Sequence, residues 1–339
     1  MKPKALIIRL SSLGDVVHAT AAAEALSLAG WEVSMVTKAA FAPLLQGHPH
    51  LAAVHSYEPA RQGESAARAA FFSWVEAEQF HAILDLHDSL RTRLWRFRLR
   101  RVAKVYVARK PRLREMLILL FRLGKWVGFP PGGRALRCRD LAHQVVREFG
   151  GEPVPSARLT RLSVAPEESE PALLPKEPFL VLLPGSAWPG KKWPGFRELA
   201  MSSPGPVVVL GGPEDKEAAS IAEAARQRQP ASVSLQGKAG LREAMAVLAR
   251  ARAIVANDTG MAHVAEALGR PVIVVEGPTH PWMGFSPWRE ESSLLGLDLV
   301  CRPCGKTGRL CWRFGLRTCL KGVTASAVLA EVRRHWGRP

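Results

Sequence analysis

The sequence predicts an α/β protein of two Rossmann-like domains that face each other across a cleft. Two observations carry this prediction. Short apolar segments of strand length alternate with helical segments along most of the 339-residue chain, and a proline-rich stretch divides the alternation into two halves. In open parallel sheets ligands bind at the carboxyl ends of the strands, so the turns that follow the strands are where we expect the site.

The first domain is predicted to span residues 1–160 and to begin with a buried strand. An Ala-rich helix follows this strand from about Val16 to Ala29 and ends at Gly30, a residue type common at helix ends. The strands of this domain are expected near residues 4–9, 32–37, 52–56 and 82–86.

A linker is predicted over residues 161–178, because prolines recur there beside an acidic run at residues 167–170. The second domain is then expected to span residues 179–322. A C-terminal helix within residues 323–339, from about Thr324 to Trp336, can pack back on the first domain. The strands of the second domain are expected near residues 179–183, 206–210, 232–235, 253–256 and 271–275.

The chain is strongly basic, with a formal net charge of +17, of which +12 falls in residues 1–165. Such a charge attracts an anionic partner: a nucleic acid, a phosphorylated glycolipid or an acidic membrane surface. No run approaches the roughly 18 apolar residues that a bilayer-spanning helix needs, and the first apolar segment is too short for a signal peptide. The sequence therefore predicts a cytoplasmic protein.

Two strand-to-helix turns carry the residues of most interest. Asp258 and Thr259 follow a strand and open a helix, where free backbone N–H groups and the positive end of the helix dipole suit a diphosphate. The first strand ends in a similar turn, in which Asp15 follows Gly14. A plain helix cap explains each aspartate without a ligand, and for Asp15 the two roles can coexist.

Two other nucleotide motifs are excluded. A dinucleotide-binding fingerprint needs three spaced glycines after the first strand, and only Gly14 is present. The segment Gly185–Lys192 follows a strand and nearly matches a P-loop. Lys192 stands where that motif needs Ser or Thr, and Pro194 comes too soon for a long helix. The glycine, serine and lysine of this segment still suit a phosphate.

Several segments, spread over nearly the whole chain, resemble the bacterial lipopolysaccharide heptosyltransferases of glycosyltransferase family 9. The segments that carry the resemblance are Ser11–His18, Leu183–Ser186, Lys192–Pro194, Asp258–His263 and Gly277–Thr279. The resemblance implies a GT-B fold and the inverting transfer of heptose from ADP-heptose to the Kdo/heptose inner core of lipopolysaccharide, with no cofactor. Which core heptose is added stays open, and so does a related nucleotide sugar or acceptor.

The resemblance and the residue types together assign roles to individual residues. Asp15 is the expected general base, and catalysis is expected to need no metal, because no DxD pair or histidine cluster is present. The expected donor residues are Gly185, Ser186, Lys192, Asp258, Thr259, Gly260 and, in a supporting role, His263. An acidic residue is implied to bind the ribose, and Glu214, Asp215 and Glu217 all stay open for it. Lys191 is expected to be solvated.

A basic block runs from Arg91 to Arg114, with eleven basic residues and no acidic one. A block of one sign repels itself, so we expect an anionic partner to neutralise it, and the resemblance implies a phosphorylated, Kdo-bearing lipid A. The expected acceptor residues are Arg61, Arg91 and Arg93, with Arg68 as a further candidate. An apolar helix face within residues 113–127 lies either on the anionic surface of the inner membrane, at its cytoplasmic side, or against the core.

Four cysteines gather near the C-terminus, and a fifth, Cys138, stands alone. A cytoplasmic location disfavours disulfides, and the spacing of the four permits a structural zinc site. The four are Cys301, Cys304, Cys311 and Cys319.

A nucleic-acid-binding protein is the alternative of a different class. It accounts for the basic block but leaves Asp15, Lys192 and Asp258 without a role. No RNA-binding motif with interleaved aromatic residues is present, so we expect no nucleic-acid partner.

Overall fold

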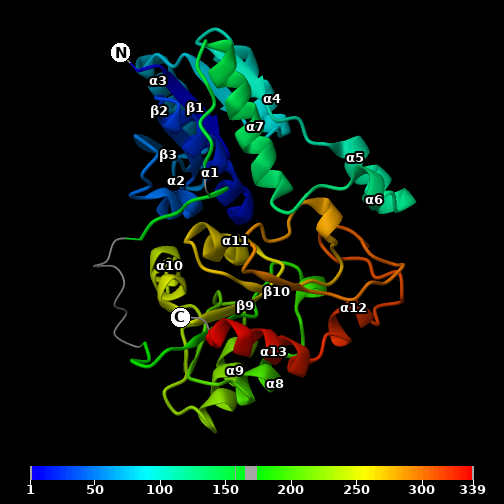
Figure 1. Ribbon diagram of the computed structural model, residues 1–339. Coiled ribbons are helices and arrows are strands. Elements are labelled where there is room, and N and C mark those ends of the chain that lie inside the picture. Colours follow the sequence, from blue (N-terminus) through cyan, green and yellow to red (C-terminus); the bar gives the residue numbers. More distant parts are fainter. Residues whose placement is uncertain (1, 157, 165–173, 338–339) are drawn as a thin grey trace. The chain divides into compact units, whose positions relative to one another are not determined.

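The computed structural model describes residues 2–156, 158–164 and 174–337, and the chain forms two compact units (Figure 1). The first unit consists of Met1–Pro111 and Arg134–Ser163. The second consists of Arg112–Gly133 and Val164–Pro339. The chain therefore enters the second unit twice, the first time for a short helical insert.

Five parallel strands form the sheet of the first unit, in the order β3-β2-β1-β4-β5. The central strand β1 pairs with β2 on one side and β4 on the other, and Ile7 lies opposite Met35 and Leu84. The strands are β1 (Lys4–Ile8), β2 (Glu32–Lys38), β3 (Ala53–Tyr57), β4 (Ala82–Asp85) and β5 (Lys104–Val107).

Helices connect these strands and bury the sheet. Phe71 of one helix and Trp95 of another pack against Ile8 and Ile83 of the sheet, so the core consists of aliphatic strand residues under aromatic helix residues. The helices of this unit are α1 (Leu13–Leu28), the 3-10 helix η1 (Ala39–Leu45), α2 (Pro59–Gln62), α3 (Glu64–Glu78), α4 (Leu90–Leu99) and α7 (Gly133–Glu148).

The second unit has a six-stranded sheet in the order β11-β10-β9-β6-β7-β8, again with parallel pairings throughout the described part. Its central strands β6 and β9 pair so that Leu182 lies opposite Val255. The strands are β6 (Leu180–Leu183), β7 (Val207–Val209), β8 (Val233–Ser234), β9 (Ala253–Asn257), β10 (Ile273–Val275) and β11 (Ser293–Leu295).

Helices of the second unit include the two of the insert. The insert consists of α5 (Arg112–Phe121) and α6 (Gly124–Val127). The others are η3 (Pro189–Lys191), α8 (Phe196–Met201), α9 (Glu217–Arg226), α10 (Leu241–Arg250), α11 (Gly260–Ala267), η4 (Pro281–Met283), α12 (Thr318–Lys321) and α13 (Ala325–Trp336). In the described part of the chain, no helix is long and apolar enough to cross a membrane.

The structure contains a strand at each of the nine predicted positions, and it adds β5 and β11. The change from one unit to the other at Ser163–Val164 falls inside the predicted linker, of which residues 165–173 lie outside the described residues.

The last helix, α13, packs on α8, β9 and β10, and its Val328 and Val332 are fully buried in the core of the second unit. One domain assignment needs correction. The insert 112–133 belongs to the second unit, although the predicted first domain included it. The physical reason is its packing: Ile118 and Phe129 form an apolar cluster with Met283.

Candidate active site

The turn between β1 and α1 places the carboxylate of Asp15 at the start of the helix. The backbone N–H and the hydroxyl of Ser12, the N-cap residue, both donate to Asp15 Oδ2, at 3.2 and 2.8 Å. Arg9, which directly follows β1, forms an ion pair with the same oxygen at 2.6 Å. The side chain of Asp15 is still 31% exposed. Asp15 therefore caps the helix and at the same time presents a carboxylate to solvent.

The surroundings of Asp15 keep it ionised. Burial by itself raises the pKa of Asp15, but the charges of Arg9 and His18 and the hydrogen bonds from Ser12 outweigh it and hold the pKa well below its usual range. Arg9 was not among the predicted site residues. Its signal in the sequence is a charged residue at the end of an otherwise apolar strand, which is costly unless the charge is paired.

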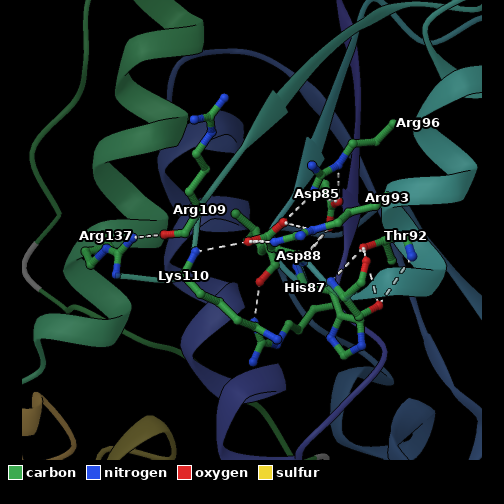
Figure 2. Close-up of polar contacts among 12 residues, drawn as sticks. Asp85, His87, Asp88, Thr92, Arg93, Arg96, Arg109, Lys110 and Arg137 are labelled. Atoms are coloured by element: carbon green, nitrogen blue, oxygen red, sulfur yellow. Dashed lines mark hydrogen bonds and ion pairs between the residues drawn. The ribbon is translucent and has the colours of Figure 1, made fainter. Parts of the chain in front are cut away.

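A second group of charges lies where β4 ends (Figure 2). Arg96 donates to Asp85 at 2.7 Å and to Asp88 at 2.6 Å, and Arg93 donates to Asp88 at 3.1 Å. The backbone N–H of His87 donates to the fully buried Asp85. These bonds fix the turn that follows β4.

His87 lies in this turn, and nearby charges, including that of Arg9 beside Asp15, shift the pKa of its imidazole. Burial and the charges of Arg9 and Lys110 lower its pKa to about 4, against smaller opposing effects of Asp85 and Asp15. The imidazole is therefore neutral at pH 7. Figure 2 also shows the backbone N–H of Lys110 donating to Asp88, which links the end of β5 to the end of β4.

Acidic side chains from outside the basic block neutralise five of its members. The pairs are Arg91–Glu64, Arg93–Asp88, Arg96–Asp85, Arg98–Glu76 and Lys104–Glu148. For these five the fold itself supplies a counter-charge, because it brings acidic residues from α3, the end of β4 and α7 beside them, so the block is less uncompensated than the sequence alone indicates. The other expected acceptor residues stay exposed: Arg61 pairs with Glu58, and Arg68 lies on α3.

In the second unit, Asp258 lies in the turn between β9 and α11 and is held by two side chains. Lys191 Nζ lies 2.7 Å from Asp258 Oδ2, and the hydroxyl of Thr279 donates to the same oxygen at 2.7 Å. Burial raises the pKa of Asp258, but the charge and hydrogen bond of Lys191 and the bond from Thr279 lower it below its ordinary value. The prediction of a solvated Lys191 is wrong, because its side chain is only 12% exposed and forms this ion pair.

The start of α11 is suited to an anion. Thr259 is its N-cap residue, yet its side chain makes no capping hydrogen bond, and among the described residues its buried hydroxyl has no partner. Gly260 opens the helix, and the first turn holds no acidic residue. His263 is buried one turn further, and its charge would act on Asp258, which fits a supporting role. Within α11 itself, no acidic side chain of the first turn compensates the helix dipole at this end.

Lys192 is held between two acidic residues. Its Nζ lies 2.8 Å from Asp215 Oδ1 and 2.6 Å from Glu217 Oε1. Burial lowers the pKa of Lys192, but these two hydrogen bonds outweigh it and raise the pKa above its ordinary value. Two of the three ribose candidates therefore hold the predicted phosphate lysine, whereas Glu214 is exposed.

The turn after β6 lies close to Asp215, one of the two acidic residues that hold Lys192. A Cβ on Gly185 would lie 2.2 Å from Asp215 Oδ2, so any larger residue there would have to displace this carboxylate. Asp215 Oδ2 also accepts a hydrogen bond from the backbone N–H of Gly212 at 3.0 Å. Ser186 accepts one from the backbone N–H of Trp188 at 3.3 Å. The structure thus brings Gly185, Lys192 and Asp215 together at one edge of the sheet.

A buried ion pair that sequence reasoning missed supports the Asp258 turn. Arg302 lies 2.6 Å from Glu276, and it donates twice to the carbonyl of Thr279, the residue whose hydroxyl binds Asp258. Both members of the pair are nearly inaccessible to solvent. Arg302 is therefore a positioning residue. The sequence did not predict this role, because the spacing of the nearby cysteines Cys301 and Cys304 indicated a metal site at this segment.

The four C-terminal cysteines are free thiols that influence one another electrostatically. Backbone N–H groups, that of Arg317 most strongly, lower the pKa of Cys311, whereas burial raises the pKa of Cys304 and Cys319. Within the described residues, no three His, Cys, Asp or Glu side chains are grouped so that they could hold a metal ion. The zinc site that the spacing of Cys301, Cys304, Cys311 and Cys319 permits is thus not assembled.

Comparisons with known proteins identify the family. The model of glycosyltransferase family 9 (heptosyltransferase) matches residues 68–311. Lipopolysaccharide heptosyltransferase 1 of Pseudomonas aeruginosa is 32% identical in an alignment of 328 positions that covers 89% of this chain and 86% of that protein. The chain belongs to glycosyltransferase family 9. Lipopolysaccharide heptosyltransferase 1 of Escherichia coli K12 is 27% identical over 82% of this chain and 89% of that protein.

Solved structures show the same fold. E. coli ADP-heptose LPS heptosyltransferase II has a TM-score of 0.71 at 20% identity and covers 99% of this chain and 98% of that one. E. coli heptosyltransferase WaaC with ADP-2-deoxy-2-fluoro heptose has a TM-score of 0.68 at 21% identity over 98% of this chain and 99% of that one. These structures show the expected GT-B fold. The family membership confirms the enzyme class expected from the motifs, a glycosyltransferase.

Proposed function

We propose that this enzyme transfers heptose from ADP-heptose to the inner core of lipopolysaccharide, with inversion at the anomeric carbon and without a metal ion. The observation that carries the proposal is a pair of strand-end sites with opposite chemistry. The first unit presents the ionised carboxylate of Asp15, and the second presents the anion-suited turn at Asp258 and Thr259. The similar proteins of P. aeruginosa and E. coli are lipopolysaccharide heptosyltransferases, which supports heptose and lipopolysaccharide, and the similar WaaC structure with ADP-2-deoxy-2-fluoro heptose supports an ADP-linked donor.

The donor site stabilises the diphosphate that leaves. Lys192, the hydroxyls of Ser186 and Thr259, and the N–H group of Gly260 supply positive charge and donors, with the dipole of α11 behind them. When ADP binds, Lys192 exchanges a carboxylate for a phosphate oxygen. Glu217, the more exposed of its two acidic partners, is then available to accept a hydrogen bond from a ribose hydroxyl.

Asp15 removes the proton of the attacking hydroxyl. As the acceptor oxygen bonds to the anomeric carbon, its proton passes to Asp15 and the bond from that carbon to the diphosphate breaks, so ADP departs. A single displacement of this kind inverts the anomeric centre. The ion pair with Arg9 keeps Asp15 deprotonated before the reaction.

The acceptor we propose is a phosphorylated, Kdo-bearing lipid A, reached from the cytoplasmic face of the inner membrane by peripheral association. Arg61, Arg91 and Arg93 are partly exposed cations of the first unit and are assigned to its anionic groups. Arg91 and Arg93 are already paired, so they bind by exchanging a protein carboxylate for a ligand one, as Lys192 does.

Product analysis tests this function. The purified enzyme is incubated with ADP-heptose and, in separate reactions, with Kdo-lipid A and with its heptosylated form, and products are identified by mass spectrometry. We expect ADP release and a gain of one heptose on one of the two acceptors, unchanged by EDTA. Transfer only from another nucleotide sugar, or activity that is lost with EDTA and restored by magnesium, would contradict the proposal.

A further inference from the structure

The insert of the second unit exposes an apolar surface. On α5, Leu113, Met116 and Leu120 follow the spacing of one helix face, and all three are exposed, Leu120 by 64%. Phe121 at the end of α5 is exposed as well, and Trp126 of α6 is 85% exposed. The sequence left two placements open for this face, a membrane surface or the core. In the structure Leu113, Met116 and Leu120 lie outside the core, whereas Val127 packs against the cluster of Ile118, Phe129 and Met283.

The opposite side of the insert is firmly packed, so this exposure belongs to a defined surface. Ile118 is fully buried against Phe129 and Met283. A Cβ on Gly124 would lie 1.9 Å from the ring of Trp282, so α6 lies directly on that ring. The 3-10 helix η4, which contains Trp282 and Met283, therefore packs against this side of the insert.

Polar contacts fix the insert in the same orientation. Lys306 lies 2.6 Å from Glu115, and Arg122 donates to the carbonyls of Pro303 and Cys301. Arg114 donates to the carbonyls of Val127 and Gly128. The guanidinium groups of Arg114 and Arg122 are thus used inside the protein.

The charge around the apolar surface has one sign. Arg112 and Lys125 are exposed beside it, and no acidic residue occurs between Glu115 and Asp140. Glu115 itself is buried and paired with Lys306. Exposed leucine, phenylalanine and tryptophan side chains rimmed by lysine and arginine match the boundary between acyl chains and anionic headgroups.

We propose that this α5–α6 surface, consisting of Leu113, Met116, Leu120, Phe121 and Trp126 with Arg112 and Lys125, docks on an anionic lipid bilayer. The inference deepens the proposed function and rests on it, because a lipid-linked acceptor requires the enzyme to work at a bilayer. Positive charge at the rim complements phosphate headgroups, whereas two copies of the surface would bring like charges together.

Flotation with vesicles tests the proposal. The full-length protein and three double variants are compared on vesicles of phosphatidylcholine and phosphatidylglycerol at low salt. Leu120→Ser with Trp126→Ser should weaken binding by at least about tenfold, because two exposed apolar side chains no longer enter the bilayer. Arg112→Glu with Lys125→Glu should also weaken it by at least about tenfold, and added salt should narrow that difference. All substituted side chains are exposed, so thermal unfolding should be unchanged.

Leu94→Ser with Phe97→Ser is the matched control, since these residues are comparably exposed on α4. The arginines around them differ from Arg112 and Lys125, because Arg91, Arg93 and Arg98 are paired with acidic side chains. It should bind vesicles like the unsubstituted protein. An equal loss in this control, no vesicle binding by the unsubstituted protein, or a change of oligomeric state without a change of vesicle binding would each overturn the proposal.

Turnover with a water-soluble acceptor that lacks acyl chains separates this proposal from the proposed function. It should be the same in all the variants. If no heptose is transferred to any acceptor, the proposed function fails, and the vesicle result still stands as a separate measurement.

Discussion

The starts of α1 and α11 are the same structural element used in two ways. Each follows the carboxyl end of a central strand and directs N–H groups away from the sheet. At α1, Asp15 lies in the first turn and accepts hydrogen bonds from Ser12. At α11, the first turn has no acidic residue, and Thr259 makes no capping bond.

This difference decides what each junction can bind. The carboxylate of Asp15 already compensates the dipole of α1, so we expect that junction to act as a base rather than as an anion site. At α11 the aspartate lies before the helix and is held by Lys191, so we expect the helix end to bind phosphate oxygens. The comparison predicts that substitutions at α1 change turnover, whereas substitutions at α11 change affinity for ADP.

The largest effect is expected from Asp15→Asn. The amide keeps the size and a capping oxygen but cannot accept the proton, so turnover should fall by about 10²- to 10⁴-fold. Binding of ADP, measured by calorimetry, should be unchanged. Ser12→Ala is the matched control: it removes one hydrogen bond to Asp15 and should leave most of the turnover. Near-normal turnover in Asp15→Asn would remove the assignment of the base.

The two helices also bury one glutamate each, with different partners. Glu24 of α1 lies 3.6 Å from Arg161, whereas Glu266 of α11 accepts hydrogen bonds from Ser292 and from the backbone N–H groups of Trp288 and Arg289. Burial raises the pKa of Glu266 to about 7, against the effect of these bonds. At pH 5 the folded protein therefore holds a proton that the unfolded chain has partly lost.

This proton makes stability depend on pH. The folded pKa is raised, so between the unfolded value near 4.5 and about 7 the free energy of unfolding falls as pH rises, by up to about 3 kcal/mol for Glu266. Glu266→Gln removes the titration, and urea unfolding should show the variant gaining stability relative to the unsubstituted protein between pH 5 and pH 8. Parallel pH profiles for the two proteins would mean that Glu266 is ionised throughout.

The sequence predicted those elements whose residues are all buried or all belong to one short motif. Strands buried on both faces, such as Ile7 and its neighbours, read as continuous apolar runs, and the motif segments identified both junctions. The short strands β5 and β11 were missed because β5 lies inside the basic block and the three residues of β11 carry no periodic signal.

Pairing between distant residues could not be read from the sequence. Glu64 and Arg91 are 27 positions apart, so the block appeared uncompensated until α3 was placed beside α4. The same holds for Lys191, whose partner Asp258 is 67 positions away. The insert was assigned to the wrong domain because its sequence shows an apolar helix face but gives no sign of which unit the other side of the helix packs against.

Lys192→Ala sharpens the comparison at the second junction. If Lys192 exchanges a carboxylate for phosphate, its loss should weaken ADP binding by about 10- to 100-fold, the equivalent of ~1.5–3 kcal/mol for a charged hydrogen bond. Calorimetry with ADP measures this. Lys191→Ala is the control, and it should differ from Lys192→Ala by lowering the thermal stability. It leaves Asp258 buried without its cation. If Lys191→Ala lost ADP affinity with unchanged stability, Lys191 would be the phosphate ligand instead.

The smallest change in ADP affinity is expected from Thr259→Val, which is compared with Thr279→Val because both threonines lie near Asp258. The hydroxyl of Thr279 donates to Asp258, whereas that of Thr259 has no partner among the described residues. Thr259→Val therefore removes no protein hydrogen bond and should leave thermal stability unchanged or slightly raised. It should weaken ADP binding by about fivefold, the equivalent of ~1 kcal/mol for one neutral hydrogen bond to the ligand.

Thr279→Val should behave in the opposite way in the stability measurement. It leaves a lone pair of the buried Asp258 unsatisfied, so the unfolding temperature should fall along with the ADP affinity. An unfolding temperature that fell as far in Thr259→Val as in Thr279→Val would show that the Thr259 hydroxyl is bonded within the protein. In that case the start of α11 would be capped like that of α1, and the distinction between the two junctions would be lost.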